Sequence, residues 1–425
     1  YSWTNNKTSI NLSASGSGDI PAFAASNITT APVVATITVT PHFTNGSVTC
    51  DGPAKTFTIT VNPTGQVNDP ADQVVCKGSS TTGVNFTTNN TLGTTTYDWI
   101  NSAPEIGLPA SGFGPIGSFV ADNPGTAPVI ATITVTPHFT NGGVTCDGPS
   151  QTFTITVNPA AQVNDLTAQV VCNGAYTSPV AFTTANTGGT ATYTWTNDNA
   201  TIGLGSGGSG NIPTFIAING GTAPEIANVE VTPHFINGSV TCDGPKKSFT
   251  ITVNPTAQVD DPANQVICNG TSTTVLSFNT INTVGTTTYT WTNNETSIGL
   301  AASGSVEIPV FTATNTDTSP VTATIAVTPH FTNDGVTCDG PAQTFTITVY
   351  PTGQVNDPAD QVVCNGSSVM AVKFNTVNTG GTTSYTWTNS APGIGLPASG
   401  SGNIPAFLAA NTGTAPVVAN ITVVP

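Results

Sequence analysis

Polar and apolar residues alternate along many short stretches of this chain. In residues 56–61, threonine alternates with Phe57, Ile59 and Val61, and residues 36–40 follow the same pattern. Successive side chains of a β-strand point to opposite faces, so each stretch predicts a strand with one buried face. Asn-Gly and Asp-Gly pairs separate the stretches, and no segment keeps a helical period. The pattern predicts an all-β fold of short strands.

The whole pattern recurs every 96 residues without insertion or deletion. Tryptophan, a His-Phe pair and two kinds of cysteine return in phase: Trp3, Trp99, Trp195, Trp291 and Trp387; His42, His138, His234 and His330; Cys50, Cys146, Cys242 and Cys338; Cys76, Cys172, Cys268 and Cys364. This period is too long for one coil of a solenoid. It matches a complete immunoglobulin-sized sandwich of about 100 residues. We therefore expect each repeat to be a domain.

The recurring Val-Asn-Pro marks the expected domain boundary. It divides the chain into three full modules, 63–158, 159–254 and 255–350. Residues 1–62 are then the C-terminal part of another module, and 351–425 the N-terminal part of a further one. Prolines in the linkers restrict the backbone and predict semi-rigid connections in an extended rod.

Composition narrows the class of function. Charged residues make up only 7% of the chain, there is no arginine, and the net charge is -16. Such a chain is repelled by phosphate backbones and by anionic membranes, which argues against nucleic-acid binding and membrane docking. No run of about 18 apolar residues predicts a transmembrane helix. The chain opens in mid-strand without a signal peptide, so we expect both ends of the gene product to lie outside this sequence.

The cysteines predict disulfides, and two pairings make sense in a repeat. One joins Cys50 to Cys76 across each linker, and the other joins Cys76 to Cys146 within a module. If Cys76 lies where the chain enters its module and Cys146 precedes the last strand, both lie at the same pole, within the roughly 7 Å that a disulfide needs. The predicted bonds are Cys76–Cys146, Cys172–Cys242 and Cys268–Cys338, with Cys50 and Cys364 paired outside this sequence. Disulfides indicate an oxidising, extracellular compartment.

Candidate sites for chemistry are few, and we predict neither an enzyme nor a cofactor. Each full repeat has one histidine, which favours a surface or packing role over a metal site. The aspartate of Cys-Asp-Gly fits a turn better than a calcium ligand. Acids near the linkers are weak calcium candidates, although an Asp-Pro turn or solvated linker explains them better: Asp69, Asp72, Asp165, Asp260, Asp261, Asp357 and Asp360. The tryptophans fit a sandwich core better than a sugar-stacking platform.

Several motifs together resemble a known family. Gln-Val-Val-Cys-Asn-Gly (361–366), Thr-Tyr-Thr-Trp-Thr-Asn (288–293), Ser-Ile-Gly-Leu-Ala-Ala-Ser-Gly (297–304), Gly-Asn-Ile-Pro-Ala-Phe (402–407) and Thr-Phe-Thr-Ile-Thr-Val-Asn-Pro (152–159) are similar to PKD-like, immunoglobulin-like repeats of giant Bacteroidetes surface proteins. Gliding-motility adhesins are the best-known members. The resemblance implies type IX export, outer-membrane attachment and an extended adhesive filament.

The sequence thus predicts a structural and adhesive extracellular filament that mediates surface attachment or gliding. Its expected partners are the neighbouring modules, other copies of the chain in a filament, and surface polysaccharide or another substratum. Two alternatives stay open: a carbohydrate-binding array, and a passive spacer for an enzyme or binding domain elsewhere in a larger protein.

Overall fold

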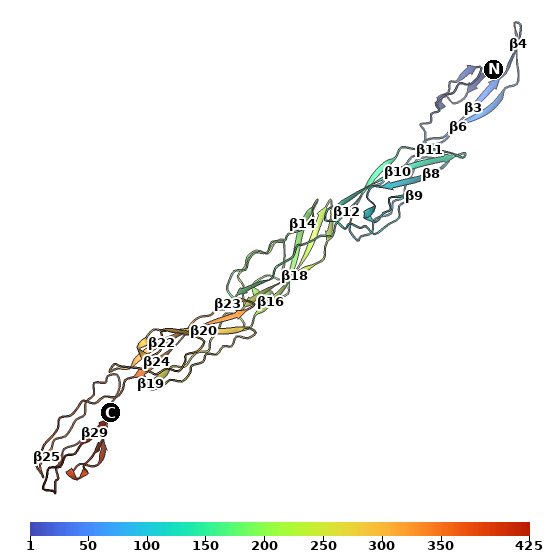
Figure 1. Cartoon of the computed structure of the whole chain (residues 1–425). Helices are drawn as coiled ribbons and strands as arrows, with labels where there is room; N and C mark the ends of the chain where they lie inside the picture. The colour runs from blue at the N-terminus through green and yellow to red at the C-terminus, as the bar shows by residue number, and fades with distance from the viewer.

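The computed structural model describes residues 1–425 as an extended rod of tandem β-sandwiches (Figure 1). The two termini lie in the modules at opposite ends of the rod, and the modules follow one another without folding back. Five separate hydrophobic cores lie along the chain. The predicted all-β class is confirmed, and only short 3₁₀ turns interrupt the strands. None of the helical turns is long enough to cross a bilayer.

Each interior module is built on one six-stranded sheet. In residues 63–158 the strand order is β7-β12-β10-β8-β9, and β11 also pairs with β10. The elements are β7 (Gln73–Cys76), β8 (Thr94–Asn101), η2 (Pro104–Ile106), β9 (Ser111–Phe113), β10 (Val129–Asn141), β11 (Val144–Asp147) and β12 (Gln151–Asn158). Isolated bridges, Ser80 with Val120 and Val84 with Ile116, tie the segments of a second layer together.

The next two modules repeat this topology. In residues 159–254 the elements are β13 (Gln169–Cys172), β14 (Thr190–Asn197), η3 (Ala200–Ile202), β15 (Gly207–Ser209), β16 (Glu225–Asn237), β17 (Val240–Asp243) and β18 (Lys247–Asn254). In residues 255–350 they are β19 (Gln265–Cys268), β20 (Thr286–Asn293), η4 (Thr296–Ile298), β21 (Ser303–Ser305), β22 (Val321–Asn333), β23 (Val336–Asp339) and β24 (Gln343–Tyr350).

The first 62 and last 75 residues contain parts of the same pattern. Residues 1–62 hold β1 (Ser2–Asn5), η1 (Thr8–Ile10), β2 (Ser15–Ser17), β3 (Val33–Thr40), β4 (His42–Asn45), β5 (Val48–Asp51) and β6 (Lys55–Val61). Residues 351–425 hold β25 (Ser368–Val369), β26 (Thr386–Asn389), η5 (Pro392–Ile394), β27 (Ser399–Ser401), β28 (Phe407–Leu408) and β29 (Ile421–Val424).

The tryptophans lie in the cores, as the sequence indicates. Trp99 is 7% exposed and the other four are 3–8% exposed. The chain opposite each indole carries a glycine, and a Cβ built on Gly112 would lie 2.2 Å from the Trp99 ring. Only glycine lets the short edge strand β9 close over the ring. A tryptophan held in this way is not available to stack on a sugar.

The first strand of each module runs parallel to the last strand. Gln73 is level with Ile155, and Cys76 with Asn158. Cys76 therefore ends its strand at the pole where the chain leaves the module. The sequence argument placed this cysteine at the entry pole, and that placement is wrong. Residues 63–72 travel along the core first, with Val67 buried in it, so the strand forms only on the way to the exit.

The hairpin that carries the other cysteine overhangs the entry pole. In module 159–254, β16 pairs with β18 only as far as Val231. Beyond this point β17 takes the place of β18, while β14 stays paired with β16 as far as Ile236. The six residues from Val231 to Asn237 extend about 20 Å at strand spacing. The hairpin therefore reaches beyond the start of β18 toward the preceding module.

Candidate functional site at the module junctions

Disulfides join neighbouring modules in this rod. Cys76 is bonded to Cys242 and Cys172 to Cys338, with Cα atoms 5.5 Å apart and a sequence separation of 166 in both cases. The predicted pairs Cys76–Cys146, Cys172–Cys242 and Cys268–Cys338 are therefore wrong. The physical reason is the parallel first strand, which puts the two cysteines of one module at opposite poles. Each bond instead joins the exit pole of one module to the overhanging hairpin of the next.

Four cysteines carry no disulfide in this structure: Cys50, Cys146, Cys268 and Cys364. Two of them, Cys50 and Cys146, occupy hairpin positions equivalent to the bonded Cys242 and Cys338. The other two occupy strand-end positions equivalent to Cys76 and Cys172. Pairing of Cys50 and Cys364 outside this sequence stays a prediction.

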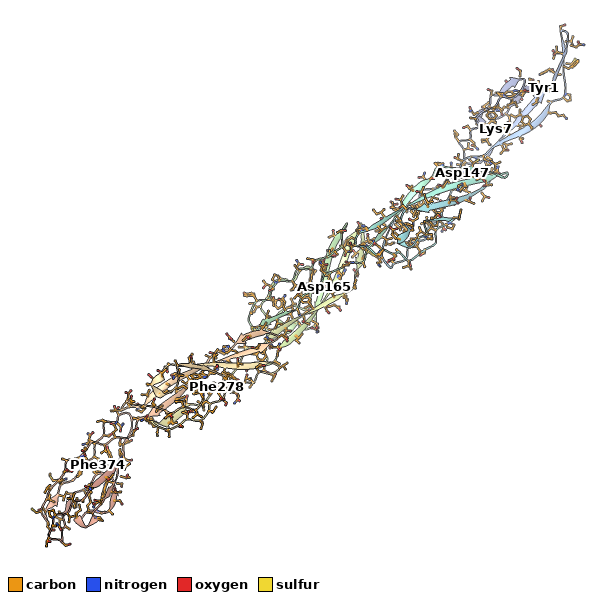
Figure 2. All side chains as sticks on the ribbon, in the orientation of Figure 1. Tyr1, Lys7, Asp147, Asp165, Phe278 and Phe374 are labelled. Carbon is orange, nitrogen blue, oxygen red and sulfur yellow. A yellow bond between two sulfur atoms is a disulfide. The ribbon has the colours of Figure 1, made fainter.

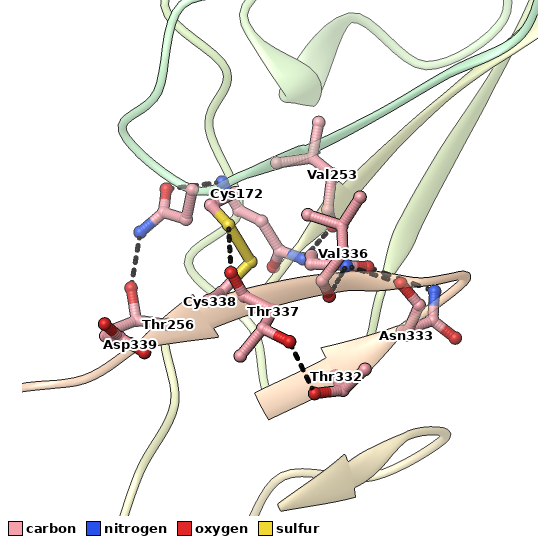
Figure 3. The surroundings of a disulfide bond; sticks show 12 residues. Cys172, Val253, Thr256, Thr332, Asn333, Val336, Thr337, Cys338 and Asp339 are labelled. Atoms are coloured by element: carbon pink, nitrogen blue, oxygen red, sulfur yellow. Dashed lines mark hydrogen bonds between the residues drawn. A yellow bond between two sulfur atoms is a disulfide. The ribbon is translucent and has the colours of Figure 1, made fainter. Parts of the chain in front are cut away.

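Paired asparagines lie beside the disulfide. Asn158, which is fully buried, ends one module, and Asn237 lies in the hairpin of the next. The Asn237 Nδ2 donates to the Asn158 Oδ1 at 2.8 Å, and the Asn158 Nδ2 donates to the Asn237 carbonyl at 3.4 Å. Equivalent pairs form at two further junctions, Asn62 with Asn141 and Asn254 with Asn333. Figure 3 shows Asn333 near the Cys172–Cys338 disulfide. Buried amides satisfied in this way fix the angle between modules.

The linker passes under the base of the hairpin at very short range. A Cβ on Gly244 would lie 1.8 Å from the carbonyl oxygen of Ala161, and a Cβ on Gly340 would lie 1.9 Å from that of Ala257. The glycine of Cys-Asp-Gly is thus required by this close approach. Sequence reasoning saw the triplet as a turn and missed its contact with the linker, because the partner is a backbone atom of another segment.

A second set of contacts crosses every junction. The backbone N–H of Thr187 donates to the carbonyl of Thr126 in the preceding module at 3.0 Å. The same bond recurs as Thr91 to Thr30, Thr283 to Thr222 and Thr379 to Thr318. Together with the disulfide and the asparagine pair, it gives the junction several separate restraints, which explains how the rod stays extended (Figure 2).

Each histidine ties the hairpin to the sheet. In module 159–254 the His234 Nδ1 lies 2.6 Å from Asp243 Oδ1, and its Nε2 lies 2.9 Å from Thr194 Oγ1. The chain of contacts spans β14, β16 and β17, and Asp243 directly follows the disulfide cysteine. The predicted surface or packing role of the histidine is therefore correct, while the aspartate is a histidine partner rather than a simple turn residue.

Module 63–158 differs at one position of this arrangement. Asp98 replaces the hydroxyl residue, and its Oδ2 lies 3.3 Å from the His138 Nε2. The hydrogen bond to Asp147 on the other ring nitrogen, at 2.6 Å, is the main cause of a raised pKa of His138, and the negative charge of Asp98 also raises this pKa. Partial desolvation opposes the shift. This imidazole favours the protonated form more than an isolated histidine does.

The linker acids do not gather into a calcium site. Asp72 accepts the backbone N–H of Thr154 at 2.6 Å, which lowers its pKa, and Asp165 pairs with Lys247 at 2.6 Å, which lowers its pKa also. The remaining candidates are exposed in the linkers: Asp69, Asp260, Asp261, Asp357 and Asp360. No three His, Cys, Asp or Glu side chains converge to hold an ion.

Comparisons with known proteins return solved structures of other tandem β-sandwiches. Drosophila N-cadherin EC1-4 matches at 12% identity over 83% of this chain and 92% of that chain, with a TM-score of 0.28. The human desmocollin-1 ectodomain matches at 10% identity over 92% and 82%, with a TM-score of 0.29. Immunoglobulin domains 1–4 of sidekick-1 match at 12% identity over 84% and 96%, with a TM-score of 0.22.

These TM-scores lie below 0.5, so the functions of these proteins are not transferred to this chain. No family model matches, and no curated protein matches. The sheet topology and the two-layer cores define the class: this is a tandem immunoglobulin-like β-sandwich protein. Its particular feature is a disulfide across each of two module junctions, which is typical of proteins outside the cytoplasm.

Proposed function

We propose that this chain is a tension-bearing segment of an extracellular adhesive stalk. The observation that carries the proposal is the disulfide between modules, because it links the exit pole of one sandwich to the entry hairpin of the next. A disulfide inside one module would protect only that module against unfolding under load. A disulfide across the junction transmits force from module to module. It also protects the linker, which is otherwise the weakest point of the rod.

The two disulfides define a covalent route that avoids the linkers. From Cys76 the route crosses to Cys242, returns along the backbone to Cys172, and crosses again to Cys338. Under load, the force in module 159–254 acts between its hairpin and the end of its first strand. The last strand and the following linker, between Cys242 and Cys268, lie outside the segment from 172 to 242 that bears this load.

The finer assignment rests on the resemblance in the sequence. We propose that the modules 63–158, 159–254 and 255–350 belong to a surface protein of the Bacteroidetes type, exported by the type IX system and attached at the outer membrane. In this setting the stalk would hold surface polysaccharide or another substratum during attachment or gliding. A long rod with few charged side chains suits such contact with uncharged polymers.

Single-molecule pulling between the two ends of the chain tests the stalk. About 70 residues separate Cys172 from Cys242, whereas about 262 separate Cys76 from Cys338. At about 3.4 Å per extended residue, reduction should release roughly 650 Å of additional length. The variant Cys76→Ser/Cys172→Ser should behave in oxidising buffer as the reduced chain does. Equal contour lengths before and after reduction would contradict the proposal.

A further inference from the structure

The hydrogen-bond chain at the hairpin has the order of a nucleophile, a base and an orienting carboxylate. In the first module the Ser2 Oγ lies 2.8 Å from the His42 Nε2, and the His42 Nδ1 lies 2.5 Å from Asp51 Oδ1. Thr290, His330 and Asp339 repeat the arrangement at 2.8 Å and 2.6 Å. We propose that Ser2, and with lower reactivity Thr194 and Thr290, are acceptor sites for an activated acyl group, with the histidine as general base.

The carboxylate sets the tautomer of the neutral imidazole. Asp51 can only accept a hydrogen bond, so the His42 Nδ1 carries the proton and the Nε2 presents its lone pair to the serine. The Ser2 hydroxyl therefore donates to the Nε2. This is the arrangement in which a histidine removes the proton of an attacking hydroxyl.

The reaction is a single acyl transfer from an activated acyl ester. The Ser2 Oγ forms a bond to the acyl carbon, the bond from that carbon to the leaving alkoxide breaks, and the hydroxyl proton passes to the His42 Nε2 and then to the leaving group. The products are an O-acyl serine and an alcohol. No oxidant or metal is required.

The open face of the sheet limits the chemistry to this one step. General-base assistance accelerates such a reaction by about 10² to 10⁴-fold. An oxyanion hole adds about 10² to 10³ per donor, but the backbone N–H groups of β1 are directed along the sheet ladder. We therefore expect acylation that is faster than at an ordinary serine but no rapid turnover of the acyl group.

The chain supplies its own controls. Ser17 lies directly opposite Ser2 on β2, is exposed, and has no histidine partner. Thr386 occupies the position equivalent to Thr194 in the last module, and its hydroxyl donates to the Val424 carbonyl instead. In module 63–158, Asp98 takes the place of the nucleophile. A general reactivity of surface hydroxyls would label Ser17 and Thr386 as well.

The test is treatment of the oxidised chain with p-nitrophenyl acetate, followed by peptide mapping. Acetyl esters are distinguished from acetylated amines by their removal with hydroxylamine. Acetylation of Ser2 should be at least about ten-fold faster than that of Ser17, the lower part of the range for general-base assistance. The variant His42→Gln should reduce the Ser2 rate to that of Ser17, while Ser17 itself is unchanged.

A second variant separates positioning from folding. In Asp51→Asn the hairpin can keep a hydrogen bond, but an amide can donate to the Nδ1 and reverse the tautomer. The ratio of Ser2 to Ser17 acetylation should fall in this variant even where circular dichroism shows an unchanged fold. Equal acetylation of Ser2 and Ser17 in the unmodified chain would overturn the proposal, as would a ratio that survives both substitutions.

Discussion

Single glycines decide how closely two segments can approach at a junction. Gly244 lies against the carbonyl of Ala161, where even a methyl group has no room. Gly244→Ala should therefore destabilise module 159–254 by about 1–3 kcal/mol, the usual cost of overpacking. Urea unfolding of the chain, followed by the fluorescence of its buried tryptophans, measures the change.

The matched control for this substitution lies in the same module. Gly205 has open space where its Cβ would be and no left-handed backbone. Gly205→Ala should change the stability by less than about 0.5 kcal/mol, as most surface substitutions do. If both variants lose the same stability, the close approach at Gly244 is not the cause.

A β-branched residue occupies a left-handed position in module 255–350. Val306 has a φ of 73°. The equivalent position of every other module is a glycine with a similar φ: Gly18, Gly114, Gly210 and Gly402. A left-handed conformation costs a residue with a Cβ roughly 1–2 kcal/mol. Val306→Gly should raise the free energy of unfolding by up to about 1 kcal/mol. The reverse change, Gly210→Val, should lower the stability of module 159–254, and thermal unfolding of both variants checks the sign.

At the scale of elements, the overhanging hairpin is the feature that organises the junction. Strands β10, β16 and β22 each have 13 residues and extend beyond their pairing with the last strands β12, β18 and β24. Their tips lie between β11, β17 and β23 on one side and β8, β14 and β20 on the other. The strands β11, β17 and β23 have four residues each, and each pairs with one neighbour only, so they form a short edge of the sheet. The histidine, the asparagine pair and, at two junctions, the disulfide therefore all act on the same small element.

The histidine makes the hairpin of module 63–158 sensitive to pH. Because the pKa of His138 is raised in the folded chain, mainly by its bond to Asp147, protonation stabilises the hairpin. This contribution is complete below about pH 6.5, the value for an unperturbed histidine, and is lost as the pH rises through the raised pKa. Hydrogen exchange of the β11 amides should therefore speed up as the pH rises, beyond its intrinsic pH dependence.

Nuclear magnetic resonance titration of the four histidines checks the cause. Asp147→Asn should lower the pKa of His138 most, because that carboxylate makes the dominant contribution, and Asp98→Thr should lower it less. Asp98→Thr also recreates the arrangement around His234. A His138 resonance that titrates alike in all three proteins would exclude both carboxylates as the cause.

At the scale of the molecule, the two disulfides interlock. The loop closed by Cys76–Cys242 and the loop closed by Cys172–Cys338 share residues 172–242. In the chain-entropy model, a disulfide that closes a loop of 166 residues stabilises the folded chain by about 5 kcal/mol. Module 159–254 is held by both loops, so it should be the last of the three interior modules to unfold.

Removing one of the two disulfides should increase the flexibility of the junction that it crosses and of no other. In Cys76→Ser/Cys242→Ser the junction between 63–158 and 159–254 keeps its asparagine pair but loses its covalent link. Distances between spin labels placed on both sides of this junction should broaden, while those across the next junction stay narrow. Cys172→Ser/Cys338→Ser should give the reverse result. Broader distance distributions at both junctions in either variant would show that the disulfides do not act locally.

The sequence by itself determined the strands, the repeat and the composition of the core. Alternation of threonine with Phe153, Ile155 and Val157, which are all buried, and the in-phase tryptophans depend only on local period and on burial, which a linear pattern records. The pairing of cysteines and the contacts of Gly244 were decided by the tertiary structure alone. They depend on the direction of the first strand and on the overhang of the hairpin, and neither leaves a local mark in the sequence. A spacing of 166 rather than 70 is consistent with the same 96-residue period, so only the three-dimensional placement of Cys76 at the exit pole could choose between them.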